Sequence, residues 1–255
     1  MAPRAASRRF PLLLALAALL AALGALLAVP GGCERASAPP AQVPSSVASS
    51  SAAPAPTQAA PAGATPSDSA PDAPVLLLLG DSLAAGYGLP PEAGFAALLQ
   101  ERLRAAGYPY RVVNAGVSGD TSAGGLARLD WLLRQRVDVL LLELGANDGL
   151  RGQDPALLRD NLAQIIERVQ ARGITVILAG MQMPANYGAD YRRRFAAVFP
   201  ELARKYKLAL IPFLLDGVAM HPELNQPDGI HPNEAGARIV ADTVWTTLET
   251  VLSKP

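Results

Sequence analysis

Short apolar runs alternate with longer amphipathic segments from residue 75 onward, and this alternation constrains the fold more than any other feature of the sequence. Several of the runs are rich in Val or Ile, and none shows a clean polar alternation. That pattern is typical of strands that are buried on both faces of a sheet. The expected strands are 75–79, 111–114, 137–144, 174–179 and 208–211.

Helices are expected between these strands, because the intervening segments carry apolar residues at helical spacing. Asp154 and Pro155 supply an N-cap and a first-turn proline to one of them, and Gly173 stands where the same helix should end. The expected helices are 92–106, 122–136, 155–172 and 189–207, with a final helix over about 233–252.

This alternation predicts the α/β fold class. Strands that alternate with helices form a mostly parallel sheet, here five-stranded, between two helix layers, which is a three-layer α/β/α sandwich. Ligands of such sheets bind beyond the carboxyl ends of the strands. The residues that follow each strand are therefore the first candidates for a functional site.

The first 33 residues have the composition of an export signal. Arg4, Arg8 and Arg9 precede an apolar run over 11–29, and Cys33 follows two glycines just beyond it. The placement of Cys33 resembles a bacterial lipoprotein signal, in which the cysteine is lipidated. An ordinary cleaved signal and an uncleaved membrane helix are the alternatives, since the run is long enough to span a bilayer.

Residues 34–73 consist almost entirely of Ala, Pro, Ser and Thr, and contain no Leu, Ile or aromatic residue. Such a segment cannot bury enough apolar surface to offset its ordering entropy, so a disordered tether is expected. The expected organisation is an export signal over 1–33, a tether over 34–73 and a folded domain over 74–255. The expected location is the periplasm or cell envelope, where a lipid on Cys33 would anchor the chain to a membrane.

Charge and residue counts exclude several functions. The chain carries 22 Lys and Arg against 22 Asp and Glu, which argues against nucleic acid as a partner. Its single cysteine cannot form an intramolecular disulfide, and its two histidines make no metal-binding cluster. We therefore expect no metal site. No cofactor is expected either, and the chain is expected to be a monomer.

Four polar clusters follow the expected strands or lie near the C-terminus: residues 80–83, 114–120, 145–148 and 228–232. Together they could perform acyl transfer, in which an imidazole activates a serine hydroxyl and a carboxylate orients the imidazole. Ser82, His231 and Asp228 are the candidates, since Asp228 reaches the same imidazole if 228–231 makes a turn. The oxyanion needs preorganised donors, and the candidates are the N–H groups of Ser82 and Gly119 and the side chain of Asn147.

Other polar residues have simpler interpretations. Ser118 is a competing serine, but residues 116–120 do not complete a G-x-S-x-G motif. His221 also precedes a proline, yet it has Val218 three residues before it. Asp81 and Asp148 are expected to brace their own loops. The run 192–194 of three arginines is either a solvated helix face or a site that attracts anionic headgroups or phosphates.

The clusters resemble the four signature blocks of the SGNH (GDSL) hydrolases. The sequence segments that carry this resemblance are GDSLAAGYG, NAGVSGDTSAGGLARL, ELGANDGLRG, PANYG and PDGIHPNEAG. They occur in the family's order, and the resemblance extends over about residues 75–252. Within the family, the chain looks most like the periplasmic group of multifunctional acyl-CoA thioesterases, arylesterases and lysophospholipases. The resemblance implies a flavodoxin-like α/β/α fold, the triad Ser82–His231–Asp228, and an oxyanion hole of Ser82, Gly119 and Asn147.

The expected activity is hydrolysis of acyl esters or thioesters, such as lysophospholipids, aryl esters and fatty-acyl thioesters, through an acyl-Ser82 intermediate. Carbohydrate or peptidoglycan O-deacetylation is an alternative within the same superfamily. A non-catalytic lipid-binding lipoprotein is the alternative from another class. The side chains expected to line an acyl channel are Leu150, Met181, Met183 and Tyr187. Core packing accounts for the two methionines equally well.

Overall fold

A computed structural model describes residues 72–252. The expected export signal over 1–33, its Cys33 and all but the last two residues of the expected tether lie outside the described residues. Within 72–252, no helix combines the length and the apolar character needed to cross a membrane.

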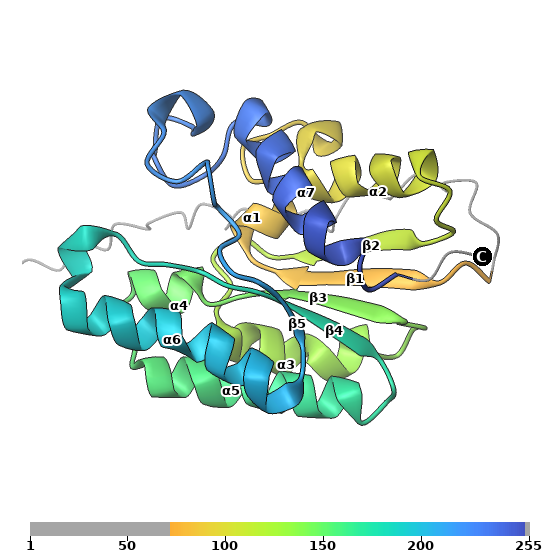
Figure 1. Cartoon of the computed structure of the whole chain (residues 1–255), viewed down its shortest axis with the longest axis horizontal. Helices are drawn as coiled ribbons and strands as arrows, with labels where there is room; N and C mark the ends of the chain where they lie inside the picture. The colour runs from red at the N-terminus through yellow and green to blue at the C-terminus, as the bar shows by residue number, and fades with distance from the viewer. Residues whose placement is uncertain (1–71, 253–255) are drawn as a thin grey trace, which may run out of the picture. The chain divides into compact units, whose positions relative to one another are not determined.

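The described residues contain one five-stranded sheet in which all four pairings are parallel. The strand order is β2-β1-β3-β4-β5, so the chain goes from the interior strand β1 to the edge strand β2 and then returns past β1 to β3 (Figure 1). This reversal is the topological switch point at which open α/β sheets bind ligands. The strands are β1 (Val75–Gly80), β2 (Arg111–Gly116), β3 (Val139–Glu143), β4 (Thr175–Ala179) and β5 (Ala209–Ile211).

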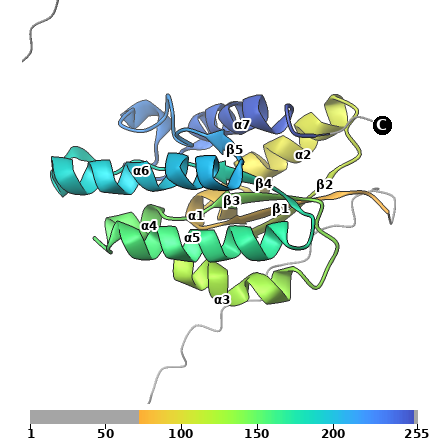
Figure 2. The same ribbon diagram turned by 60° about the horizontal axis from the view of Figure 1, so that its bottom comes forward.

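Helices cover both faces of the sheet, which confirms the predicted sandwich. Figures 1 and 2 show α1, α2 and α7 on one face, and α3, α4, α5 and α6 on the other. The helices are α1 (Ser82–Ala85), α2 (Phe95–Ala105), α3 (Ser122–Leu132), α4 (Ala146–Leu150), α5 (Pro155–Gln170), α6 (Ala189–Tyr206) and α7 (Glu234–Leu248). Three 3-10 turns, η1 (Pro91–Ala93), η2 (Ala185–Tyr187) and η3 (Pro222–Leu224), lie in the connections.

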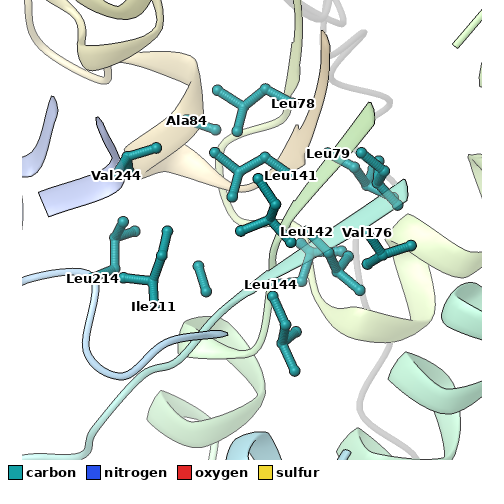
Figure 3. Close-up of a cluster of buried hydrophobic side chains, with 14 of the residues drawn as sticks. Leu78, Leu79, Ala84, Leu141, Leu142, Leu144, Val176, Ile211, Leu214 and Val244 are labelled. Carbon is teal, nitrogen blue, oxygen red and sulfur yellow. The ribbon is translucent and has the colours of Figure 1, made fainter. Parts of the chain in front are cut away.

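Alternate residues of the central strands supply the two halves of the core. Leu78 pairs with Leu141 in the β1–β3 register, and Leu79 pairs with Leu142. Figure 3 shows the first pair on the side of Ala84 in α1, and the second pair on the opposite side of the sheet. Every residue of β1 and β3 is buried, as the unbroken apolar runs predicted.

The element bounds differ from the expected ones mainly at the ends. The run 137–144 forms a strand only over Val139–Glu143, and the helix expected over 122–136 ends at Leu132. The predicted caps of α5 are confirmed, since the Asp154 side chain accepts a hydrogen bond from the N–H of Ala156 and Pro155 occupies the first turn. The short helices α1 and α4 were not predicted, and both begin at the expected active-site clusters.

Candidate active site

Ser82 lies where β1 turns directly into α1, at the sheet's switch point. Asp81 caps this turn, because its Oδ1 accepts a hydrogen bond of 3.0 Å from the Leu83 N–H. Gly80 is required beneath the turn. A Cβ there would lie 2.3 Å from Glu143 Oε2 and 2.6 Å from the Ala84 side chain.

His231 and Asp228 come from the loop before α7 and reach Ser82 across the carboxyl ends of the strands. His231 Nε2 lies 2.9 Å from Ser82 Oγ, and His231 Nδ1 lies 2.7 Å from Asp228 Oδ2. The other carboxylate oxygen, Oδ1, accepts the backbone N–H groups of Ile230 and His231, each at 3.0 Å. The loop therefore makes the turn that the spacing of Asp228 and His231 requires.

The environment of Asp228 keeps its carboxylate charged. Desolvation favours the neutral acid, but the hydrogen bonds from the His231 ring and from the two backbone N–H groups outweigh it. Together they lower the pKa of Asp228 from 3.8 to about 2. Asp228 can therefore orient the imidazole and stabilise its protonated form over the whole neutral range.

Two residues that sequence analysis missed hold the histidine loop in place. The ring of Tyr87 contacts the imidazole of His231, with 4.7 Å between ring centroids. Gln226 Nε2 donates to the carbonyl oxygens of Tyr87 at 2.7 Å and Pro232 at 3.0 Å. Gln226 thereby ties the loop after α1 to the loop that carries His231, although the two are far apart in sequence.

The expected oxyanion donors Gly119 and Asn147 line the same cavity as Ser82. Gly119 has a φ of 81°, a left-handed backbone that favours glycine, and its carbonyl accepts a 2.8 Å hydrogen bond from Arg151. Asn147, in the first turn of α4, donates one side-chain N–H to Asp81 Oδ2 at 3.1 Å. Its amide has a second N–H available for a ligand.

Asp81 is a buried titratable residue that contacts the side chain of Asn147. Burial raises its pKa from 3.8 to about 6, and hydrogen bonds from the Leu83 N–H and the Asn147 side chain, with the charge of His231, partly offset that rise. Asp81 thus caps α1, as expected for a loop brace, and also holds the side chain of Asn147.

A cavity of about 520 Å³ opens beside Ser82 and His231. Leu150, Met181 and Met183 line it as expected, but Tyr187 does not. The Tyr187 hydroxyl instead donates a hydrogen bond of 2.8 Å to the carbonyl oxygen of Leu150, which is a residue of the cavity wall. Further apolar residues of the wall come from loops whose contribution the sequence pattern did not indicate: Tyr87, Phe213, Leu215, Ala219, Met220 and Ile230.

The competing residues have other contacts. Ser118 lines the cavity, but His231 Nε2 faces Ser82. His221 is exposed and lies 3.2 Å from Glu223. Asp148 does not brace its own loop as expected, because its carboxylate accepts the N–H and the hydroxyl of Ser122 at the start of α3.

The arginine run at the start of α6 is divided between the cavity and the surface. Arg192 lines the cavity, and its Nε donates a 2.9 Å hydrogen bond to the Met183 carbonyl oxygen. Arg193 and Arg194 form exposed ion pairs with Asp190. The solvated-face interpretation therefore fits two of the three arginines.

Among residues 72–252, no three His, Cys, Asp or Glu side chains gather closely enough to hold a metal ion. The described cluster consists of a hydroxyl, an imidazole and a carboxylate in hydrogen-bonded sequence, next to backbone and amide donors and a cavity with largely apolar walls. Acyl transfer from an ester to water is the chemistry that these groups can perform together.

Comparisons with known proteins agree with this geometry. The family model described as GDSL-like Lipase/Acylhydrolase family matches residues 78–239, a stretch that contains Ser82, Asp228 and His231. Esterase TesA of Pseudomonas aeruginosa is 49% identical over 181 residues, which cover 71% of this chain and 90% of the relative. Thioesterase 1/protease 1/lysophospholipase L1 of Escherichia coli is 41% identical over 182 residues, covering 71% and 86%.

Solved structures give the same result. The crystal structure of TesA has a TM-score of 0.68 at 48% identity and covers 70% of this chain and 99% of its own. AlinE4, described as an SGNH-hydrolase family esterase, has a TM-score of 0.60 at 42% identity, with 71% and 98% covered. The family model matches well over half of the chain, and the relatives are matched over most of their length. The chain therefore belongs to the GDSL-like lipase/acylhydrolase family and is an ester hydrolase.

Proposed function

We propose that the chain hydrolyses acyl esters and thioesters through a covalent acyl-Ser82 intermediate. The observation that carries the proposal is the continuous contact from Asp228 through His231 to the Ser82 hydroxyl, at 2.7 and 2.9 Å. In the acylation step, Ser82 Oγ attacks the carbonyl carbon while His231 Nε2 takes the hydroxyl proton. His231 then gives that proton to the leaving alcohol or thiol as the bond to the acyl group breaks.

Deacylation repeats the same transfers with water. His231 takes a proton from water, whose oxygen attacks the acyl carbon, and returns it to Ser82 as the free acid leaves. In both steps the oxyanion receives hydrogen bonds from the Ser82 and Gly119 N–H groups and from the free N–H of Asn147. Asp228 remains ionised throughout, because its pKa is lowered to about 2.

The cavity supports acyl groups longer than acetyl as substrates. Its apolar wall can hold an alkyl chain, and the methionines Met181 and Met183 can adapt to chains of different length. Aryl esters, fatty-acyl thioesters and lysophospholipids all present such an acyl group. The names of the relatives, which include a thioesterase, a lysophospholipase and an arylesterase, support the same substrate class.

The test compares the purified full chain with its Ser82→Ala variant on p-nitrophenyl esters from acetyl to long-chain acyl. Ser118→Ala is the matched control, because it removes a second hydroxyl from the same cavity. We expect Ser82→Ala to lose activity at every chain length, Ser118→Ala to keep it, and medium or long chains to be preferred. Activity in Ser82→Ala at the wild-type rate would refute the mechanism, and activity confined to acetyl esters would favour a deacetylase.

We also infer that residues 1–73 export the domain and tether it to a membrane through Cys33. The support is the sequence alone: a basic start, an apolar run over 11–29, one cysteine and a tether of Ala, Pro, Ser and Thr. Mass spectrometry of the chain isolated from membranes should find the lipid on an N-terminal Cys33. A Cys33→Ser variant should appear in the soluble fraction, and unchanged membrane association would contradict the lipid anchor.

A further inference from the structure

Glu143 is a buried carboxyl group to which the mechanism above gives no role. It ends β3 and pairs with Gly80 in the sheet register, directly beneath the turn that carries Ser82. Only 1% of the residue is exposed. Its Oε2 accepts the Asp81 N–H at 3.1 Å, and the Ala84 N–H also donates to the carboxyl group. Glu143 therefore holds the backbone on both sides of Ser82.

These hydrogen bonds decide which N–H of the turn remains free. The first N–H groups of a helix have no acceptor inside it. In α1 the Leu83 N–H is bound by Asp81, and the Ala84 N–H is bound by Glu143. The helix itself supplies no acceptor for the Ser82 N–H, and Ser82 lines the cavity. The two carboxyl groups thus leave this donor for the oxyanion.

The surroundings of Glu143 favour the uncharged acid. Burial and the neighbouring charge of Asp81 raise the pKa of Glu143 well above its usual value, and its two backbone donors offset this only partly. Its other oxygen, Oε1, is buried and has no hydrogen-bond partner within the described residues. A charge on such an oxygen would be far more costly than a neutral group.

An uncharged Glu143 leaves the negative charge of the pair on Asp81. Two charged neighbours act on Asp81: Asp120 opposes its charged form, and His231 favours that form when its ring is protonated. Arg128 donates to the Gly80 carbonyl oxygen and pairs with Asp120 from the α3 side. Asp81 Oδ2 can then accept the Asn147 amide as a carboxylate and fix the direction of its second N–H.

We propose that Glu143 is a positioning residue that acts in its uncharged form, clamping the backbone around Ser82 so that the Ser82 N–H and, through Asp81, the Asn147 amide point at the oxyanion. The proposal rests on the proposed role of Ser82 as the nucleophile. It also accounts for Gly80, since a Cβ at that position would overlap Glu143 Oε2.

The experiment compares Glu143→Gln and Glu143→Leu in the full chain. Gln keeps a carbonyl oxygen for both backbone donors and cannot ionise, whereas Leu removes the acceptor. Leu140→Ala is the control, because it opens space in the same strand, away from Ser82, and costs stability without touching the turn. The measurements are kcat and KM on a p-nitrophenyl ester from pH 5 to 9, the rate at which a phosphonate ester modifies Ser82, and thermal unfolding.

We expect Glu143→Gln to stay within about threefold of the wild-type kcat with the same pH profile, because its acceptor geometry is retained. Glu143→Leu should lose roughly 100-fold in kcat and in phosphonylation rate with little change in KM, as misplacement of reacting groups does. Leu140→Ala should unfold at lower temperature and keep its kcat. If Glu143→Leu does not fold, Glu143→Met, which keeps the length of the side chain, replaces it.

Three results would overturn the proposal. A Glu143→Gln variant as slow as Glu143→Leu would show that the charge is needed. Wild-type kcat and phosphonylation in a folded Leu or Met variant would show that the clamp has no role. A wild-type enzyme that is active but not phosphonylated at Ser82 would instead refute the nucleophile itself, and with it the clamp, so the two failures are distinguishable.

Discussion

Replacing Asp228 with Asn should move the proton of His231 to the wrong ring nitrogen. In the native loop, Oδ1 of Asp228 accepts the N–H groups of Ile230 and His231, while Oδ2 faces His231 Nδ1. An Asn has only one oxygen, and the two backbone donors hold it. Its NH₂ group then faces Nδ1, which must accept, so the ring proton moves to Nε2. A protonated Nε2, 2.9 Å from Ser82 Oγ, cannot take the proton of the hydroxyl.

The size of the effect follows from the hydrogen bonds. Turning the amide over to restore the productive tautomer would lose two backbone hydrogen bonds, at about 1–3 kcal/mol together, so that form is populated at roughly 1–20%. The variant also loses the carboxylate charge that stabilises the protonated imidazole, which lowers kcat further. We expect kcat to fall by roughly 10³ to 10⁴, in the range known for this substitution in other serine triads. The midpoint of thermal unfolding should change little, because the backbone hydrogen bonds of the loop remain.

The assay combines ester hydrolysis with ¹⁵N NMR of the imidazoles. The chain has only two histidines, so a His221→Asn spectrum assigns both rings. Wild-type His231 should carry its proton on Nδ1, and the Asp228→Asn variant should carry it on Nε2. Glu223→Gln makes the same acid-to-amide change beside His221 and should leave kcat unchanged. A Nδ1-protonated ring in Asp228→Asn, or a kcat within about tenfold of wild type, would refute the reasoning.

Three further substitutions test the site and its support. Asn147→Ala removes one oxyanion donor and should lower kcat by roughly 10² to 10³ with little change in KM, measured on the same ester. Asp81→Asn tests a buried acid whose pKa is raised from 3.8 to about 6. The folded state then binds the proton more tightly than the unfolded state, so wild-type stability should fall as pH rises from about 4 to about 6. Between about pH 4 and 6, the free energy of unfolding measured in urea should fall less for Asp81→Asn than for the wild type. An equal fall in the two proteins would contradict the assignment of the raised pKa to Asp81. Gly116→Ala places a Cβ 2.3 Å from the Ala85 backbone nitrogen, so it should cost about 1–3 kcal/mol and lower the midpoint of thermal unfolding.

The layers of the fold could be predicted because burial leaves a direct mark on sequence. A strand covered on both faces needs an apolar run, and β1 has one throughout, as β3 does up to Glu143. The helices α2, α5 and α6 are long enough for a helical period to appear. The helices α1 and α4 have only four and five residues, too few to show a period, and so they were missed.

The reacting groups could be predicted because the topology brings the ends of parallel strands together. The blocks after β1, β2 and β3 had to meet at one edge of the sheet, whatever the details of packing. The contacts that hold them in place could not be predicted in this way. Tyr87 and Gln226 act through loops, and the hydrogen bond between them spans 139 residues of sequence. Neither position shows a period or a charge pattern that points to the other.

Glu143 marks the limit of sequence reasoning most clearly. In the sequence it is one acid near the end of an apolar run. Only the register of β1 against β3 places it under Gly80, and only its burial there makes it an uncharged acceptor. The glycine of the Gly80-Asp81-Ser82 block then has a physical cause that its own neighbours in sequence do not supply. A side chain at position 80 would occupy the space of the carboxyl group that holds Asp81 and Ala84, so Gly80 and Glu143 can only be understood as a pair.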